Sequence, residues 1–306
     1  MRTRPEEMPS GLAPIPAAAE VRRALPAARL PTRSSLTIFL LFPALLFLAI
    51  FFAYPMIGIV IRSVAGPAGF SVAQYVTIVA HPIYLRVFQI TFEIALTVTI
   101  VTLLLGYPLA YALVHWGKLA TGVIMACIML SMFTDILVRT YAWMILLAPD
   151  GVINQLLGFV GIGQVKLLFN RFAVLVGMIY ALLPYMVLTL YSVMHGIDRR
   201  LLQAARNLGA SGWRAFWHIF LPLSLPGVAG GSLLVFILAL GYFITPRLLG
   251  GAGDQMIAMV IEEQVELSMN WGFASALAII LLLLTLGGFL LYNRFVGLKS
   301  LFESKV

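Results

Sequence analysis

The sequence predicts an all-α membrane protein with six transmembrane helices. Of its 306 residues, 61% are hydrophobic and only 10% are charged, whereas a soluble domain carries about 25% charged residues. Six apolar runs are long enough to cross a bilayer core of about 30 Å, which takes about 20 helical residues. Backbone polar groups in lipid must be satisfied within each segment, so we expect helices. The runs cover roughly 36–61, 87–115, 121–147, 172–195, 220–245 and 272–295.

The two ends of the chain are expected to lie outside the membrane domain. Residues 1–35 are rich in Pro, Ala and Arg and show no apolar periodicity, which predicts a disordered cytoplasmic tail. The first apolar run begins too late and is too long for a cleaved signal peptide. We therefore assign 36–298 to the six-span domain and 299–306 to a cytoplasmic C-terminal tail.

The basic residues predict the orientation. Six spans place both termini on one side, and that side, with the loops 116–120 and 196–219, carries 14 of the 20 Lys and Arg residues. The positive-inside rule places both termini and the loop 196–219 on the cytoplasmic side of the membrane. We expect this membrane to be the cell (inner) membrane. The net charge of +8 is then explained by these loops and by membrane lipid, with no nucleic acid partner. One cysteine and four scattered histidines predict neither a disulfide framework nor a metal site.

The loop 196–219 contains a short helix with a start and a stop signal. Asp198 is suited to cap a helix that runs over 199–208, and Gly209 follows as a C-terminal stop because glycine accepts left-handed geometry. Ser211 is suited to cap the next helix, which Leu221-Pro222 should end or bend. Spacings of three and four place four apolar residues of the first helix on one face: Leu201, Ala204, Ala205 and Leu208.

The same loop resembles a family signature. Gln203-Ala204-Ala205, Gly209 and Ile219-x-Leu221-Pro222 follow the spacing of the EAA loop, EAA-x3-G-x9-I-x-L-P, found in permease subunits of ATP-driven (ABC) importers. Gln203 replaces the glutamate, which removes a charge from that position. The alternative is an amphipathic helix that rests on the membrane surface.

Three further stretches, with Tyr54-Pro55, resemble the spermidine/putrescine permease branch of that family over roughly 36–295. They are Gly-Tyr-Pro-Leu-Ala-Tyr at 106–111, Val-Arg-Thr-Tyr-Ala-Trp at 138–143 and Thr-Pro-Arg-Leu-Leu-Gly-Gly at 245–251. Permeases for opines, other small amines and ferric complexes are similar, so the solute stays open.

The resemblance implies a type I ABC importer permease fold with a cytoplasmic coupling helix between helices four and five. Its partners would be a cytoplasmic ATPase dimer, a second permease subunit that is a different chain, and a periplasmic or lipoprotein substrate-binding protein. Residues at the ATPase contact would be Arg199, Arg200, Gln203, Ala204, Ala205, Leu208 and Gly209. The sequence has no Gly-x4-Gly-Lys-Ser/Thr pattern, so we expect no enzyme and no bound cofactor, with ATP and Mg on the partner ATPase.

Two acidic residues, Glu93 and Asp135, occur within apolar runs, where an unpaired charge is costly. With Tyr141 and Trp143, Asp135 would offer a polyamine a carboxylate and aromatic faces; the alternative is an ion pair with Arg139, four residues on. Glu93 faces either the pathway or a helix interface.

Other candidates lie near the outer mouth. Tyr242 and Phe243 either gate the pathway or pack in the bundle. Glu262, Glu263 and Glu266 either attract cations and the binding protein or form a solvated loop face. One rival function is an ion-coupled carrier or channel, which would use Glu93 and Asp135 as coupling groups. The other is an intramembrane enzyme, but the sequence has no Gly-x-Ser-x-Gly or His-Glu-x-x-His pattern.

Overall fold

The structure is a computed structural model that describes residues 33–66, 69–161 and 163–296. Most of the predicted tail 1–35 and all of the predicted tail 299–306 lie outside these residues. The chain divides into two compact units, 1–57 and 58–306. In the first unit, α2 (Arg33–Leu48) continues through a π-helical turn, η1 (Ala49–Ala53), into α3 (Tyr54–Ser63), which ends in the second unit.

Within the described residues, six helical segments are long and apolar enough to cross a membrane, as the sequence predicts. They are Leu41–Ser63, Pro82–His115, Ile136–Phe159, Arg171–His195, Gly212–Leu240 and Trp271–Leu290. Five of them match the predicted runs in position, and the third does not.

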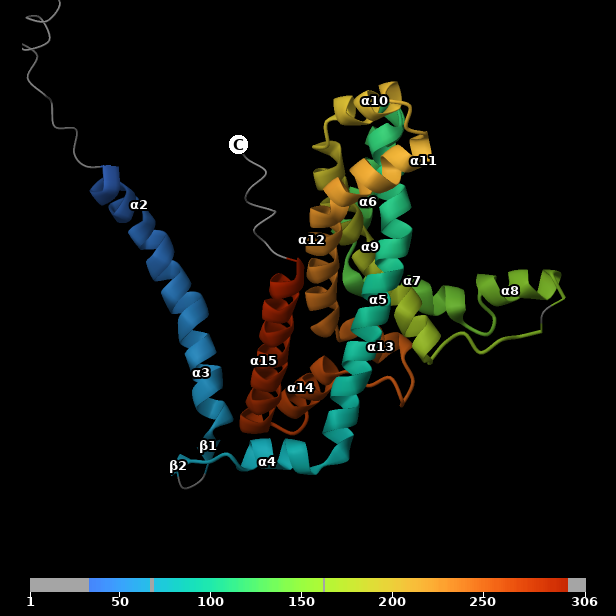
Figure 1. Cartoon of the computed structure of the whole chain (residues 1–306). Coiled ribbons are helices and arrows are strands. Elements are labelled where there is room, and N and C mark those ends of the chain that lie inside the picture. The colour runs from blue at the N-terminus through green and yellow to red at the C-terminus, as the bar shows by residue number, and fades with distance from the viewer. Residues whose placement is uncertain (1–32, 67–68, 162, 297–306) are drawn as a thin grey trace, which may run out of the picture. The chain divides into compact units, whose positions relative to one another are not determined.

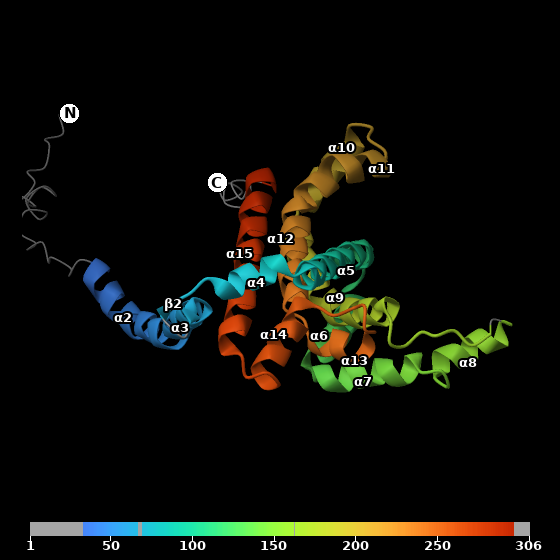
Figure 2. The same ribbon diagram turned by 90° about the horizontal axis from the view of Figure 1, so that it is seen from below.

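The prediction of one unbroken third span over 121–147 is wrong. The chain forms α6 (Lys118–Phe133), breaks at Thr134 and Asp135, and continues as α7 (Ile136–Leu147). Asp135 has an extended backbone, and its carboxylate accepts a hydrogen bond of 2.8 Å from the amide of Leu137, so it caps α7. Hydropathy misses this break because one capping residue hardly changes the average of an apolar run. A short helix, α8 (Val152–Phe159), follows and extends away from the core (Figure 2).

The main core forms where α5 (Pro82–His115), α9 (Arg171–His195) and α12 (Leu221–Leu240) pack side by side (Figures 1 and 2). Glycines on α12 allow close approach to α9: a Cβ on Gly231 would lie 2.9 Å from the sulfur of Met186, and one on Gly227 would lie 2.9 Å from Val193. The fully buried side chains include Ile94, Val98, Met178, Met186, Leu190, Val235 and Ala239.

A second core forms where α4 (Ala73–Ala80), α14 (Ile257–Glu266) and α15 (Trp271–Val296) meet the beginning of α5. A short hairpin, β1 (Ala65–Gly66) and β2 (Gly69–Phe70), precedes α4. The amide of Ile257, at the start of α14, donates a hydrogen bond of 2.8 Å to the buried hydroxyl of Thr91 on α5. The connection between the fifth and sixth spans is largely helical, with α13 (Ile244–Leu249) followed by α14.

Candidate coupling helix and transport pathway

The loop between the fourth and fifth spans forms a short helix, α10 (Arg199–Asn207), across one end of the bundle (Figure 1). The carboxylate of Asp198 accepts a hydrogen bond of 2.8 Å from the amide of Arg200. At the other end, Gly209 has a φ of +86°, and the amide of Ala210 donates to the carbonyl of Ala205 at 3.0 Å. Both the predicted cap and the predicted left-handed stop are confirmed.

One face of α10 is apolar and open. Leu208 is 89% exposed and Leu201 is 47% exposed, and Ala204, which shares their face at spacings of three and four, is also exposed. Gln203 is exposed as well, but on another side of the helix. On the opposite side, Leu202 packs against the main core. The helix therefore offers small and apolar side chains to a partner while its other side anchors it to the bundle.

A non-helical turn over 208–211 joins α10 to a helical segment that continues into the fifth span. The hydroxyl of Ser211 accepts a hydrogen bond of 3.4 Å from the amide of Arg214, so the predicted cap forms. Helix α11 (Gly212–Ala215) then passes through a π-helical turn, η2 (Phe216–Phe220), directly into α12. Proline lacks an N–H and clashes with the preceding turn of an α-helix, and the wider π turn just before Pro222 accommodates it.

Asp135 and Arg139 do not form an ion pair with each other among the described residues. Asp135 is exposed, and its carboxylate is turned to the N-terminus of α7. Arg139 is turned inward, and its Nε and Nη1 atoms are buried without a hydrogen-bond partner in the described part of the chain. An exposed carboxylate on a membrane helix is expected to face water or a partner rather than hydrocarbon, so this side of α7 is a candidate pathway wall.

The two aromatic residues predicted to accompany Asp135 separate in the structure. Tyr141 is exposed, whereas Trp143 is half-buried and packs edge-on against Tyr180 of α9, with ring centroids 5.6 Å apart. The Tyr180 hydroxyl accepts a hydrogen bond of 3.3 Å from Ser131 on α6. Residues two apart on a helix, such as Tyr141 and Trp143, point in different directions. Asp135, Tyr141 and Trp143 therefore do not form one binding cluster in this state.

Glu93 is part of a polar network that joins three segments. Its carboxylate lies 3.0 Å from Nη1 of Arg171, at the start of α9, and accepts a hydrogen bond of 2.8 Å from Gln89. Nε of Arg171 lies 3.3 Å from the largely buried Asp254, which also accepts from the amide of Gly251. This arrangement favours the helix-interface interpretation of Glu93. Sequence reasoning missed Arg171 and Asp254, which have no fixed spacing to Glu93.

Two of the stretches that resemble the spermidine/putrescine branch meet in space. The buried hydroxyls of Thr140 on α7 and Thr245 on α13 lie 3.1 Å apart. Glycines allow the close packing of α13: a Cβ on Gly177 would lie 2.6 Å from Leu249, and one on Gly251 would lie 2.6 Å from the carbonyl of Phe169. These stretches therefore fix the relative positions of α7, α9 and α13.

The remaining candidates lie around the same end of the second unit. Tyr242 and Phe243 link α12 to α13, with Tyr242 half-buried against the main core and Phe243 more exposed. Glu262 forms an ion pair with Arg247, and burial raises the pKa of its carboxyl although Arg247 opposes the shift. These acids lie on α14 rather than on a loop, and Glu263 accepts a hydrogen bond of 3.3 Å from Gln255, while Glu266 is exposed.

Comparison with known families gives a match over most of the bundle. A family model described as "Binding-protein-dependent transport system inner membrane component" matches residues 102–297. This range includes α10 and both stretches that meet at Thr140 and Thr245.

Named relatives cover a larger part of the chain. The chain is 34% identical over 257 residues to the spermidine/putrescine transport system permease protein PotB of Haemophilus influenzae, covering 80% of this chain and 85% of the relative. It is 36% identical over 202 residues to PotB of Escherichia coli, covering 65% and 74%. It is 32% identical over 232 residues to the inner membrane ABC transporter permease protein YdcU of Escherichia coli, covering 70% and 71%.

A similar fold occurs in a solved structure of a bacterial alginate ABC transporter in complex with an alginate pentasaccharide-bound periplasmic protein. The TM-score is 0.71 at 21% identity, covering 87% of this chain and 95% of the matched chain. At this identity the comparison concerns the fold.

Proposed function

Because the chain belongs to the family of inner-membrane components of binding-protein-dependent transport systems, we propose that it carries a polyamine, such as spermidine or putrescine, across the inner membrane. The chain is a multi-pass permease subunit of an ABC importer and is not itself an enzyme. The relatives named spermidine/putrescine permeases support the solute class.

The observation that carries the mechanism is the open apolar face of α10, held between its two caps. A capped helix transmits rigid-body motion, and the short turn that joins α10 to α11 is held by hydrogen bonds from the amides of Gly209 and Ala210 to carbonyls of α10. Its nine residues offer a contact about 14 Å long. We assign this face to a cytoplasmic ATPase dimer, which would bind ATP and Mg and drive the switch between outward-open and inward-open states.

The other partners follow from the same membership. A second permease subunit, a different chain, would complete the pathway, and a periplasmic or lipoprotein binding protein would deliver the solute. The charge distribution supports an orientation with both termini and α10 in the cytoplasm.

Asp135 supplies the carboxylate for the cationic solute in this proposal. It is exposed at the break between α6 and α7, and the hydrogen bond that its carboxylate accepts among the described residues comes from its own helix. By contrast, Glu93 is neutralised by Arg171, which makes it a poor coupling group for an ion-driven carrier.

The test is uptake of labelled spermidine and putrescine into liposomes that contain the whole importer with its binding protein. Uptake should require ATP. Asp135→Asn should lower the initial rate about tenfold at limiting solute, because charge-assisted hydrogen bonds contribute about 1.5–3 kcal/mol. The control is Asp150→Asn, which removes another exposed carboxylate in the turn after α7. ATP-independent uptake would refute the ABC mechanism. Uptake of labelled opines or ferric complexes, but not of labelled polyamines, would refute the proposed solute.

A further inference from the structure

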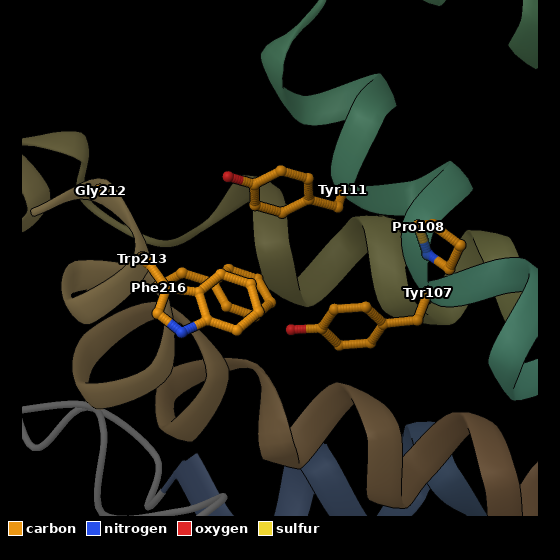
Figure 3. Close-up of a pocket in the computed structure, with 6 residues that line it drawn as sticks. All are labelled: Tyr107, Pro108, Tyr111, Gly212, Trp213 and Phe216. Carbon is orange, nitrogen blue, oxygen red and sulfur yellow. The ribbon is translucent and has the colours of Figure 1, made fainter.

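A groove lined by aromatic rings lies between α5 and the segment that follows α10. Its volume is about 410 Å³. In Figure 3 the rings of Tyr107 and Tyr111 extend from α5 toward the rings of Trp213 and Phe216. We call it the aromatic groove; its lining consists of Tyr107, Pro108, Tyr111, Gly212, Trp213 and Phe216.

A second groove adjoins the first, because Tyr107, Pro108 and Phe216 line both. Its volume is about 350 Å³. Apart from Trp217, its other walls are aliphatic side chains of α5 and α12, so we call it the aliphatic groove; they are Leu103, Leu104, Leu221, Leu225 and Val228. The two grooves together therefore present rings and hydroxyls near α10 and hydrocarbon further along the span.

The walls of the aromatic groove are held in place by contacts within the protein. The ring of Tyr111 packs edge-on against Phe216 and Phe220, with centroids 5.4 and 5.0 Å apart. The hydroxyl of Tyr107 lies 2.9 Å from that of Ser224 on α12. Edge-to-face pairs of this kind are favourable in themselves, so the groove exists without an occupant.

The charged residues that adjoin the segments of the aromatic groove in sequence are basic, and we call Lys118 and Arg214 the basic rim. Arg214 follows Trp213 in α11 and is exposed, and Lys118 begins α6 and is exposed. The ring of His115 lies 4.2 Å from that of Tyr111, between centroids. Neither 94–134 nor 199–253 contains an acidic residue. Aromatic rings alone would suit an ammonium group, but a polyamine would find no carboxylate here and would be repelled by the basic rim.

We propose that the two grooves bind one phospholipid molecule. The phosphate lies at the basic rim beside Arg214, the Trp and Tyr rings lie at the headgroup level where such rings are favoured, and an acyl chain fills the aliphatic groove. The lipid bridges α5 and the α11–α12 segment, which joins α10 to its span. This site is separate from the solute pathway and goes beyond the proposed transport function.

The test uses two matched pairs of exposed leucines, each changed to tryptophan. In each pair, one leucine lines the aliphatic groove, so that its replacement fills the groove, and the other does not line it and serves as the control. On α5, Leu104 lines the groove and is 67% exposed, while its neighbour Leu105 is 51% exposed and does not line it. On α12, Leu225 lines the groove and is 51% exposed, while Leu223 is 43% exposed and does not. All four changes affect open positions, so the fold should tolerate them equally.

The measurement is native mass spectrometry of the purified importer after exchange into detergent micelles that contain phosphatidylglycerol or phosphatidylethanolamine. Wild type, Leu105→Trp and Leu223→Trp should retain one phospholipid per copy of this chain. Leu104→Trp and Leu225→Trp should retain about fivefold less, because the larger ring takes the space that the acyl chain would fill. Arg214→Gln should weaken retention of both lipids, with the larger loss for the anionic one.

Three results would overturn the proposal. The first is equal lipid retention in all four tryptophan variants. The second is displacement of the lipid by spermidine in wild type, which would make the aromatic groove a cation site. The third is an efficient disulfide between Leu225→Cys and a cysteine placed on the second permease, which would show that a protein helix fills the groove. ATP-driven uptake, measured in parallel, reports separately on the transport function.

Discussion

Gly209 offers a sharp test of the coupling helix. Its φ of +86° ends α10, and a Cβ built on it would meet no atom within 4 Å. A side chain at this position therefore meets no steric clash with its surroundings, and the whole effect comes from the backbone. Left-handed geometry costs a non-glycine residue about 1–2 kcal/mol, and a β-branched residue is least able to adopt it.

Gly209→Val should therefore unwind the end of α10 in a large share of molecules. A change of one or two kcal/mol alters an equilibrium about 5- to 30-fold, so we expect uptake per ATP hydrolysed to fall by about fivefold or more. The assay is the ratio of the initial uptake rate to the ATPase rate for the whole importer in liposomes.

Two controls separate backbone geometry from side-chain bulk. Gly209→Asn should retain most of the coupling, because Asn tolerates left-handed geometry. Gly163→Val adds the same bulk at an exposed loop position without positive φ, where a Cβ meets no atom within 4 Å, and it should be neutral. If Gly209→Val couples as well as Gly209→Asn, the left-handed stop has no role in coupling.

Three further predictions concern stability. Asp198→Ala removes the cap on the amide of Arg200 and should destabilise α10 by about 1 kcal/mol; hydrogen exchange in α10 should quicken, and unchanged exchange would contradict the cap. Arg139→Met removes buried, unpartnered donors and should raise the thermal unfolding midpoint of the isolated chain, since such groups cost about 1–3 kcal/mol; a lower midpoint would show that an acceptor exists. Burial raises the pKa of Glu262 against the pull of Arg247, so the folded chain binds this proton more readily than the unfolded chain. Its contribution to stability is then fully present below the ordinary pKa of 4.5 and is lost as the pH rises through the raised folded pKa; Glu262→Gln should flatten that part of the profile, and an unchanged slope would contradict the assignment.

The break in the third span changes how Asp135 is understood. In a continuous helix its carboxylate would lie beside Arg139, and the two charges would neutralise each other. In the structure it caps α7 and remains exposed, while the Nε and Nη1 atoms of Arg139 are buried without an acceptor among the described residues. The positions of both charges thus depend on whether α6 and α7 form one helix or two.

The sequence by itself determined that there are six spans, the positions of five of them, and the caps of α10. These features depend on local quantities: the length of an apolar run, one capping carboxylate at Asp198, and one glycine free to adopt positive φ at Gly209. Each can be evaluated within a few residues, so no knowledge of the packing is needed.

Only the tertiary structure decided what the charged and aromatic residues contact. Glu93 and Arg171 are 78 residues apart in sequence, and Tyr107 and Ser224 are 117 apart. Such contacts depend on which faces of α5, α9 and α12 meet. The sequence of a helix that is hydrophobic on all sides does not indicate which face packs against a neighbour. For the same reason the sequence could propose Asp135, Tyr141 and Trp143 as one cluster, and only the fold could separate them.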